Sequence, residues 1–501
     1  METGNPNMAR NEGAGAQGNI QGNIDEASIL ELQEFMERGA LTSRELVLHY
    51  MERIATHDRG GAAINSVLEL NPDALAIADA LDAERRVTGA RGPLHGIPVL
   101  LKDNIDTGDH MHTSAGSIAL AESYAPEDSA VADRLREAGA VLLGKTNMTE
   151  WANFIAEDMP NGYSSRGGQV RNPYGPGQFD VGGSSSGSGA AVASSFAVVA
   201  IGTETSGSIL SPASANSVVG IKPTVGLISR HGIIPISHSQ DTAGPMAKSV
   251  ADAAILLGVL TGVDVRDPVT RASVSGVCRN YRQFLDPDGL VGARLGVLRP
   301  RYFEKLDSDR LAIFERALAA MAGAGAVIVD PVLLPEEDVS GHEVLIHEFK
   351  AALNAYLSRL SPRVPVHTLA ELIAYNEEHA AVALRHGQAL FKRAEEASGT
   401  LTEASYIRTR LDDLRRSRER GIDHALAEHH LDALLSPGNF GAALPAKAGY
   451  PSICAPGGYT PAGEPFGVTF TGGAYSEPTL IRLAYGFERL TNCRRPPDSV
   501  R

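Results

Sequence analysis

The sequence predicts an α/β protein in which helices flank one large, mixed, mostly parallel twisted sheet. Residues 293–335 alternate strand, helix and strand, at 294–298, 311–322 and 326–329, which is typical of a doubly wound sheet. Apolar residues make up 43% of the chain, aromatic residues only 5%, and there are 52 glycines, which favours alanine-rich helices packed closely on a sheet. Because no Pro/Ser-rich linker or run of charge divides residues 25–497, we expect a single domain there, after a disordered tail over residues 1–24.

The N-terminal part begins with two expected helices, each announced by a capping box, Ser28 with Glu31 and Thr42 with Glu45. Residues 64–70 are predicted to form a strand and 72–86 a helix. The next apolar strand ends in Lys102, and lysine is rarely buried unless it is paired or functional. Taken alone, Lys102 is best explained as a side chain that reaches solvent or pairs with its neighbour Asp103.

Residues 128–181 continue the alternation and then become irregular. A helix is expected over 128–138, a strand over 141–143, and a short helix over 149–155 that carries Trp151. Residues 158–181 are rich in Gly, Asn and Pro, and irregular segments of this length are often functional. Arg166 and Arg171 lie there and could steer a substrate, although solvated surface arginines are more common.

Two glycine-serine clusters, residues 182–189 and 206–208, flank a small apolar run that predicts a helix over 189–196 and a strand over 198–203. If the strand runs back beneath the helix, Ser184 and Ser208 share one site. A flexible linker is disfavoured by the apolar run, and a phosphate-binding loop by the lack of a following Gly-Lys-Ser/Thr. Residues 183–187 match the G-x-S-x-G nucleophile elbow with Ser185 at its centre, but the residues before them have loop chemistry, not that of a strand.

The order GGSSSGSGAA, GTETSGSI and GIKPT resembles the amidase signature family, whose members hydrolyse C–N amide bonds with a Ser–Ser–Lys triad. The resemblance extends from about residue 29 to residue 497. It implies the amidase signature fold, with Ser208 as the nucleophile, Ser184 as the bridging serine after a cis peptide, and Lys102 as the base. Val181 is a departure, because many members have proline there.

Other residues are expected to support this site. The oxyanion hole is expected from the backbone N–H groups of Thr205, Ser206, Gly207 and Ser208. The resemblance suggests that Arg230, Ser239 and Asp241 buttress the active-site loops. Gly183 and Ser185 are also expected to support the site. His231 and His238 invite a Ser-His-Asp scheme, but their spacing pairs them with no nucleophile.

The remaining chain completes the expected domain. A helix is predicted over 249–260, mostly helical structure over 336–430, returning strands over 434–437, 452–456 and 466–470, and a final helix over 478–490. In the family, residues corresponding to the region 300–430 vary and close over the substrate pocket, whereas residues 64–260 correspond to the core.

The composition indicates which binding partners and which cellular compartment to expect. The net charge is −15, with 60 acidic against 45 basic residues and no basic cluster, so nucleic acid and anionic membranes are poor partners. Cys278, Cys454 and Cys493 are odd in number and scattered, which suits a reducing compartment and excludes a cysteine zinc site. No signal-peptide pattern or long apolar run is visible, so we expect a cytoplasmic protein, with a removed export signal left open. We expect no metal or cofactor, and a monomer or homodimer.

The expected substrate is a small-molecule or peptide amide. Residues 145–154, the GTETSGSI element and residues 226–254 look most like bacterial peptide amidases, which favours hydrolysis of peptide C-terminal amides through an acyl-enzyme. Residues 438–448 look shorter than in those enzymes, and a more open pocket would suit an aryl-acylamide or carbamate (urethane) hydrolase. A tRNA-linked amidotransferase is disfavoured because it requires a partner enzyme. A non-catalytic binding protein is disfavoured by the intact Lys102, Ser184 and Ser208.

Overall fold

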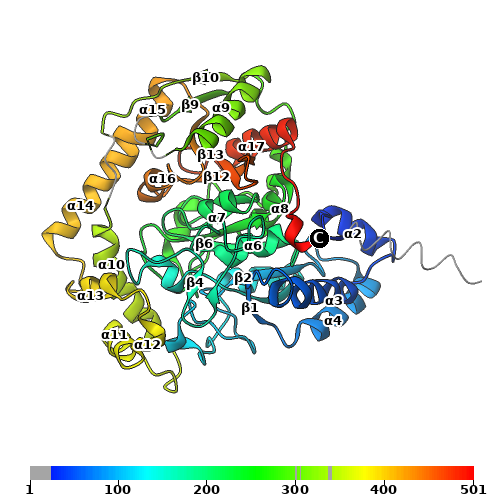
Figure 1. Cartoon of the computed structure of the whole chain (residues 1–501), viewed down its shortest axis with the longest axis vertical. Helices are drawn as coiled ribbons and strands as arrows, with labels where there is room; N and C mark the ends of the chain where they lie inside the picture. The colour runs from blue at the N-terminus through cyan, green and yellow to red at the C-terminus, as the bar shows by residue number, and fades with distance from the viewer. Residues whose placement is uncertain (1–23, 300–301, 305, 337–340) are drawn as a thin grey trace, which may run out of the picture.

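The computed structural model describes residues 24–299, 302–304, 306–336 and 341–501, so the predicted tail lies almost wholly outside the described residues (Figure 1). Within these residues, eleven strands form one sheet in the order β1-β3-β2-β6-β8-β7-β12-β13-β11-β9-β10. The strands are β1 Val67–Leu70, β2 Pro98–Lys102, β3 Val141–Thr146, β6 Val199–Glu204, β7 Val219–Lys222, β8 Thr242–Ala247, β9 Arg294–Val297, β10 Val327–Val329, β11 Ala433–Pro437, β12 Ser452–Tyr459 and β13 Pro465–Thr471. A separate two-stranded ribbon pairs β4 Tyr163–Ser164 with β5 Gly168–Gln169.

The sheet is mixed, as predicted, and its parallel pairs lie in two blocks. Strands β3, β2 and β6 are parallel neighbours, and so are β11, β9 and β10. The other neighbours are antiparallel, and β8 inserts between β6 and β7 and runs against both. Antiparallel neighbours need no crossover helix, which is why a short connection can join β12 to β13.

Helices cover the sheet, and the N-terminal ones lie on the right in Figure 1. Both predicted capping boxes are present, at the starts of α2 and α3. The helices that flank the sheet are α2 Ile29–Glu37, α3 Ser43–Arg53, α4 Ala74–Thr88, α5 Ala130–Glu137, α6 Ser186–Ala193, α7 Leu210–Ala215, α8 Val250–Leu260, α9 Ser308–Gly323, α16 Ala443–Ala448 and α17 Glu477–Thr491. No helix of the described residues is long and apolar enough to cross a membrane.

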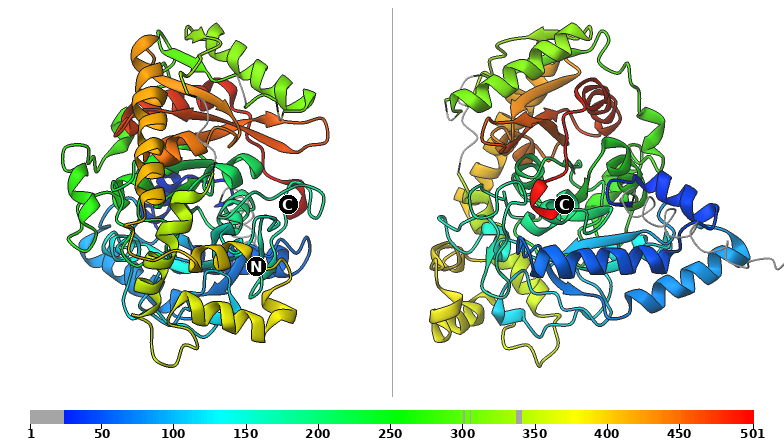
Figure 2. Two further views of the ribbon diagram at one scale, coloured as in Figure 1. Left: turned by 90° about the vertical axis from the view of Figure 1, so that its left-hand side faces the viewer. Right: turned by 45° about the vertical axis from the view of Figure 1, so that its right-hand side comes forward.

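A second group of helices covers one side of the molecule, on the left in Figure 1 and facing the viewer in the left panel of Figure 2. They are α10 Glu343–Leu357, α11 Leu369–Glu378, α12 Ala380–Ala383, α13 Ala389–Glu395, α14 Ala404–Leu414 and α15 Asp423–Glu428. Aromatic contacts join this group to the core: the rings of Phe154 and Phe349 lie 4.8 Å apart, and those of Trp151 and Phe391 lie 5.7 Å apart. The mostly helical region expected over 336–430 is therefore confirmed for its described residues.

Two predicted helices differ in the structure. Helix α6 begins at Ser186, three residues before the predicted start, because the last residues of the first glycine-serine cluster enter the helix instead of the loop. Residues 149–155 form only a short 3-10 turn, Glu150–Asn153, in which Trp151 and Ala152 have left-handed backbone angles (φ 49° and 54°). These angles are incompatible with the α-helix expected there.

Candidate active site

Lys102 ends β2 at the edge where β6 also ends, since the two strands are parallel and Leu101 lies beside Ile201. Polar groups at this edge of an α/β sheet commonly form ligand sites. The lysine is completely buried, and its Nζ donates to Ser184 Oγ at 2.8 Å and to Thr203 Oγ1 at 2.9 Å. Burial lowers the pKa of Lys102 to about 7, although Glu204 and Asp241 act in the opposite direction. Lys102 therefore neither reaches solvent nor pairs with Asp103.

Ser184 precedes α6 and follows a cis peptide bond from Gly183. Its carbonyl accepts a hydrogen bond from the Thr149 N–H at 3.1 Å, and the N–H of the next residue, Ser185, donates to the carbonyl of Ser208 at 3.1 Å. The structure thus brings the segments of Ser184 and Ser208 side by side, as expected from the helix and returning strand.

Ser185 does not face the pocket. Its Oγ donates to the Thr203 carbonyl at 3.0 Å and accepts from the Thr203 N–H at 3.2 Å, and the side chain is buried. The geometry therefore gives Ser185 a supporting position, in which it ties the start of α6 to β6, and it disagrees with a nucleophile elbow centred on this residue.

The loop between β6 and α7 carries Ser208 and is organised by the buried carboxylate of Glu204, a residue of the GTETSGSI element that is not among the expected site residues. Glu204 Oε1 accepts from the Gly207 N–H at 2.8 Å, and Oε2 accepts from the N–H groups of Ile209 and Leu210 at 2.7 and 3.0 Å. Carboxylates stabilise the orphan N–H groups at the start of a helix. The loop around Ser208 is therefore held from the protein interior.

This arrangement corrects one part of the expected oxyanion hole. The Gly207 N–H is already bound to Glu204, so it is not a free donor. Among the described residues, the N–H groups of Thr205, Ser206 and Ser208 find no acceptor. Gly207 still has φ 82°, a left-handed conformation that glycine adopts without strain.

Asp241 supports the same loop through a second set of contacts. Its Oδ1 accepts from Thr205 Oγ1 at 2.5 Å, and its Oδ2 accepts from the N–H groups of Ile236 and Ser237, both at 2.8 Å. Burial raises the pKa of Asp241 to about 6. Asp241 thus joins the loop of Ser208 to residues 236–241.

Arg230 and Ser239 also contact this segment. Arg230 forms a bidentate pair with Asp267, at 2.7 and 2.8 Å, and donates to the carbonyl of His238. The Ser239 N–H donates to Glu348 Oε2 on α10 at 3.2 Å. Residues 236–241 are therefore anchored to Asp267 and to the helices of the second group.

We expect Asp241→Ala to lower kcat by about 10²-fold through displacement of the loop of Ser208. It should also lower Tm, because three donors lose their acceptor at about 1–3 kcal/mol each. Thr205→Val removes only the contact to the loop, so it should lower kcat with a smaller change in Tm. Steady-state kinetics and thermal melts measure both effects. A normal kcat in Thr205→Val would contradict this role of Asp241.

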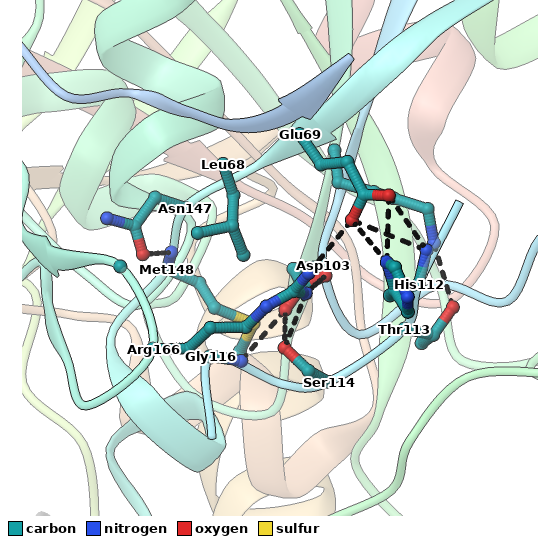
Figure 3. Close-up of polar contacts among 12 residues, drawn as sticks. Leu68, Glu69, Asp103, His112, Thr113, Ser114, Gly116, Asn147, Met148 and Arg166 are labelled. Atoms are coloured by element: carbon teal, nitrogen blue, oxygen red, sulfur yellow. Dashed lines mark hydrogen bonds and ion pairs between the residues drawn. The ribbon is translucent and has the colours of Figure 1, made fainter. Parts of the chain in front are cut away.

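The Arg166 side chain is mostly buried in a network of polar contacts. It pairs with Glu69 at 2.9 Å and donates to Ser114 Oγ at 3.1 Å, while Glu69 also contacts the ring of His112 (Figure 3). Asp103 lies 3.5 Å from the Arg166 guanidinium and accepts from the Gly116 N–H at 2.9 Å. This network fixes the chain directly after Lys102, so Arg166 has a structural position.

A pocket of about 520 Å³ is lined by Ser208 and is called the Ser208 pocket below. Its wall combines residues of the Ser208 loop with amide and apolar side chains from segments far apart in the chain. The lining residues are Ala152, Asn153, Phe154, Glu157, Asn161, Gly183, Thr205, Ser206, Gly207, Ser208, Ser211, Ile236, His342, Leu345, Leu390 and Asn439. No sequence pattern marks His342, Leu345 and Leu390 as pocket residues, because the helical region that carries them has no motif. The sequence indicates a functional position for Thr203 and Glu204 only weakly, since each is a polar residue at the end of a buried strand.

The two histidines that invite a Ser-His-Asp scheme lie elsewhere. His231 Nε2 is 3.1 Å from Glu127, His238 Nε2 is 3.5 Å from Glu348, and neither lines the Ser208 pocket. Among the described residues, no group of three or more His, Cys, Asp or Glu side chains is placed to hold a metal ion.

Comparisons with known proteins show which family the chain resembles over most of its length. A family model described as Amidase matches residues 45–447. An Arabidopsis thaliana protein named Probable amidase is 40% identical over 489 residues, covering 95% of this chain and 92% of its own length. A glutamyl-tRNA(Gln) amidotransferase chain from Synechococcus sp. CC9311 is 31% identical and covers 94% of this chain and 98% of its own length.

Solved structures lead to the same family. Native peptide amidase from Stenotrophomonas maltophilia superposes with a TM-score of 0.89 at 47% identity, over 94% of this chain and 98% of that one. An amidase family protein from Bacillus anthracis superposes with a TM-score of 0.91 at 38% identity, over 98% of this chain and 95% of that one. The chain therefore belongs to the amidase family and is an enzyme of the C–N hydrolase class.

Proposed function

We propose that Lys102, Ser184 and Ser208 form a proton relay that hydrolyses amides through an acyl-enzyme, with C-terminal amides of peptides or similar small amides as substrates. The observation that carries this proposal is the 2.8 Å contact between the buried Lys102 Nζ and Ser184 Oγ, next to a pocket that Ser208 lines. Serine is a weak nucleophile and must be activated by a neighbouring base.

The relay starts from the uncharged amine. Because the pKa of Lys102 is about 7, about half of the protein molecules carry a neutral Lys102 amine at pH 7. Neutral Lys102 takes a proton from Ser184, which takes one from Ser208, and Ser208 Oγ then attacks the amide carbon. The buried Thr203 hydroxyl holds the amine in line with Ser184.

The tetrahedral intermediate places negative charge on the former carbonyl oxygen. The free N–H groups of Thr205, Ser206 and Ser208 are the donors available to it. When the intermediate collapses, Ser184 returns the proton to the leaving nitrogen, which departs as ammonia from a primary amide. Water then attacks the acyl-enzyme with the same relay as base, which releases the acid and restores Ser208.

The proposed substrate class is supported by the similarity to the Stenotrophomonas peptide amidase at 47% identity. It is also supported by the pocket, in which apolar side chains such as Phe154, Leu345 and Leu390 accompany amide side chains such as Asn153 and Asn439. Apolar walls with a few polar groups suit a peptide end. The same apolar wall would accept an aryl amide or an aryl carbamate, which is the second candidate.

The experiment is a substrate panel with the purified chain: N-acetyl dipeptide amides, p-nitroanilides, aryl carbamates and glutamine. Ammonia release from the dipeptide amides, with the internal peptide bond intact by mass spectrometry, supports the proposal. Faster cleavage of anilides or carbamates favours the second candidate. Hydrolysis of glutamine alone would overturn both.

We further propose a cytoplasmic enzyme that acts as a monomer or homodimer, without nucleic acid or membrane partners. The net charge of −15 and the free thiols of the three cysteines support this proposal. Size-exclusion chromatography with light scattering measures the oligomeric state, and a larger assembly would contradict it.

A further inference from the structure

The Ser208 pocket has an uneven distribution of charge. Of its described lining residues, only Glu157 and His342 are ionisable, and none is lysine or arginine. Glu157 follows the apolar residues 154–156 and lies on the same stretch of wall as Phe154. The pocket therefore combines an acidic side chain with apolar lining residues such as Phe154 and Leu345.

The Glu157 carboxylate is available to bind a ligand. Its side chain is exposed, and no described residue forms a hydrogen bond or an ion pair with it. A second carboxylate lies one layer behind the wall: Asn161, which lines the pocket, donates to both carboxylate oxygens of Asp180 at 3.1 Å. No described cation pairs with Asp180, so this part of the wall carries uncompensated negative charge.

The basic residues named above near the site already form hydrogen bonds or ion pairs within the protein. Lys102 is fully buried and donates to Ser184 and Thr203. Arg166 pairs with Glu69, and Arg230 pairs with Asp267. The described residues therefore offer no cation in the pocket to bind a substrate carboxylate, whereas Glu157 can bind an ammonium group.

We propose that Glu157 makes the pocket selective for amides whose acyl part carries a cationic group, such as short peptide amides with a free N-terminal ammonium. This inference rests on the proposed function and adds the charge of the preferred substrate to it. Because Glu157 is exposed, its attraction is screened by water and amounts to a modest factor: we expect about a fivefold preference in kcat/KM.

The experiment compares dipeptide and tripeptide amides of one sequence in three forms: free amine, N-acetyl and N-succinyl. The wild-type enzyme should prefer the free amine about fivefold over the acetyl form and disfavour the succinyl form, and the preference should weaken at high salt. Glu157→Gln should bring the three kcat/KM values together. The neighbouring exposed acid Asp158 does not line the pocket, so Asp158→Asn should retain the wild-type order.

The outcomes separate this inference from the proposed function. Hydrolysis of all three forms at equal kcat/KM, or a preference that survives Glu157→Gln, would overturn the role of Glu157 and leave the amidase proposal intact. An equal loss of preference in Asp158→Asn would assign the effect to general surface charge and overturn the assignment to Glu157. Failure to hydrolyse any of the amides would overturn both proposals.

Discussion

Replacing Ser208 with alanine is expected to lower kcat for amide hydrolysis by about four to six orders of magnitude, with the fold retained. Ser208 lines the pocket, and its loop is held by Glu204 and Asp241 through backbone and Thr205 contacts that do not involve the Ser208 hydroxyl. The substitution therefore removes the nucleophile and leaves the loop in place. Ammonia release measures the activity, and circular dichroism with a thermal melt measures the fold.

A second serine in the same pocket provides the control. Ser211 lies on α7 one turn after Ser208, and its Oγ accepts from the Gly183 N–H at 3.3 Å. Ser211→Ala should keep kcat/KM within about tenfold of the wild type, because a single hydrogen bond contributes about 1 kcal/mol. A fluorophosphonate should label the wild type and Ser211→Ala, and should not label Ser208→Ala. Wild-type turnover by Ser208→Ala would refute the assigned nucleophile.

The residues of the candidate relay could be predicted because each lies at the end of a recognisable local pattern. Lys102 closes an apolar strand, and Ser184 and Ser208 sit in glycine-serine clusters on either side of a helix and strand. The contacts that tune them could not be predicted. The Glu204 carboxylate accepts from the Gly207 N–H because the chain turns back on itself after β6. A sequence pattern does not show which N–H group a nearby carboxylate will bind.

Long-range pairs show the same limit. The sequence places Arg166 among loop residues, which leaves a substrate-steering role open to it. Its partners, Glu69 and Asp103, come from strand β1 and from the end of β2, far away in the chain (Figure 3). A charged residue in a predicted loop can therefore be recognised from the sequence, but its partners, and with them its role, cannot.

For the fold, strand–helix alternation identified the α/β class, and it is clearest in β9, α9 and β10. The order of strands was not accessible, because β8 enters between β6 and β7 after the long segment 223–241. Nothing in the apolar pattern of β8 distinguishes a parallel from an antiparallel neighbour. The pattern specifies that a strand is buried and does not specify its partner.

Lys102→Met is expected to lower kcat/KM by about 10²- to 10⁴-fold, the range of a general base. In the wild type, kcat/KM should rise with pH through about 7 and then level off, because burial lowers the pKa of Lys102 to about 7 and only the neutral amine can accept a proton. Below that pH, the ammonium form dominates and the rate falls by about tenfold per pH unit. Measuring kcat/KM between pH 5 and 9 tests this acidic limb of the pH profile, that is, the rise of kcat/KM with pH up to about 7.

Two variants assign the limb to Lys102. Lys102→Arg keeps a cation that cannot lose its proton, so it should be as inactive as Lys102→Met at every pH. Thr203→Val removes an acceptor that lies 2.9 Å from Lys102 Nζ and favours the ammonium form. The pKa of Lys102 should therefore fall further, and the limb should move to lower pH. A limb that stays in place in Thr203→Val, or activity in Lys102→Arg, would mean that a different group supplies the base.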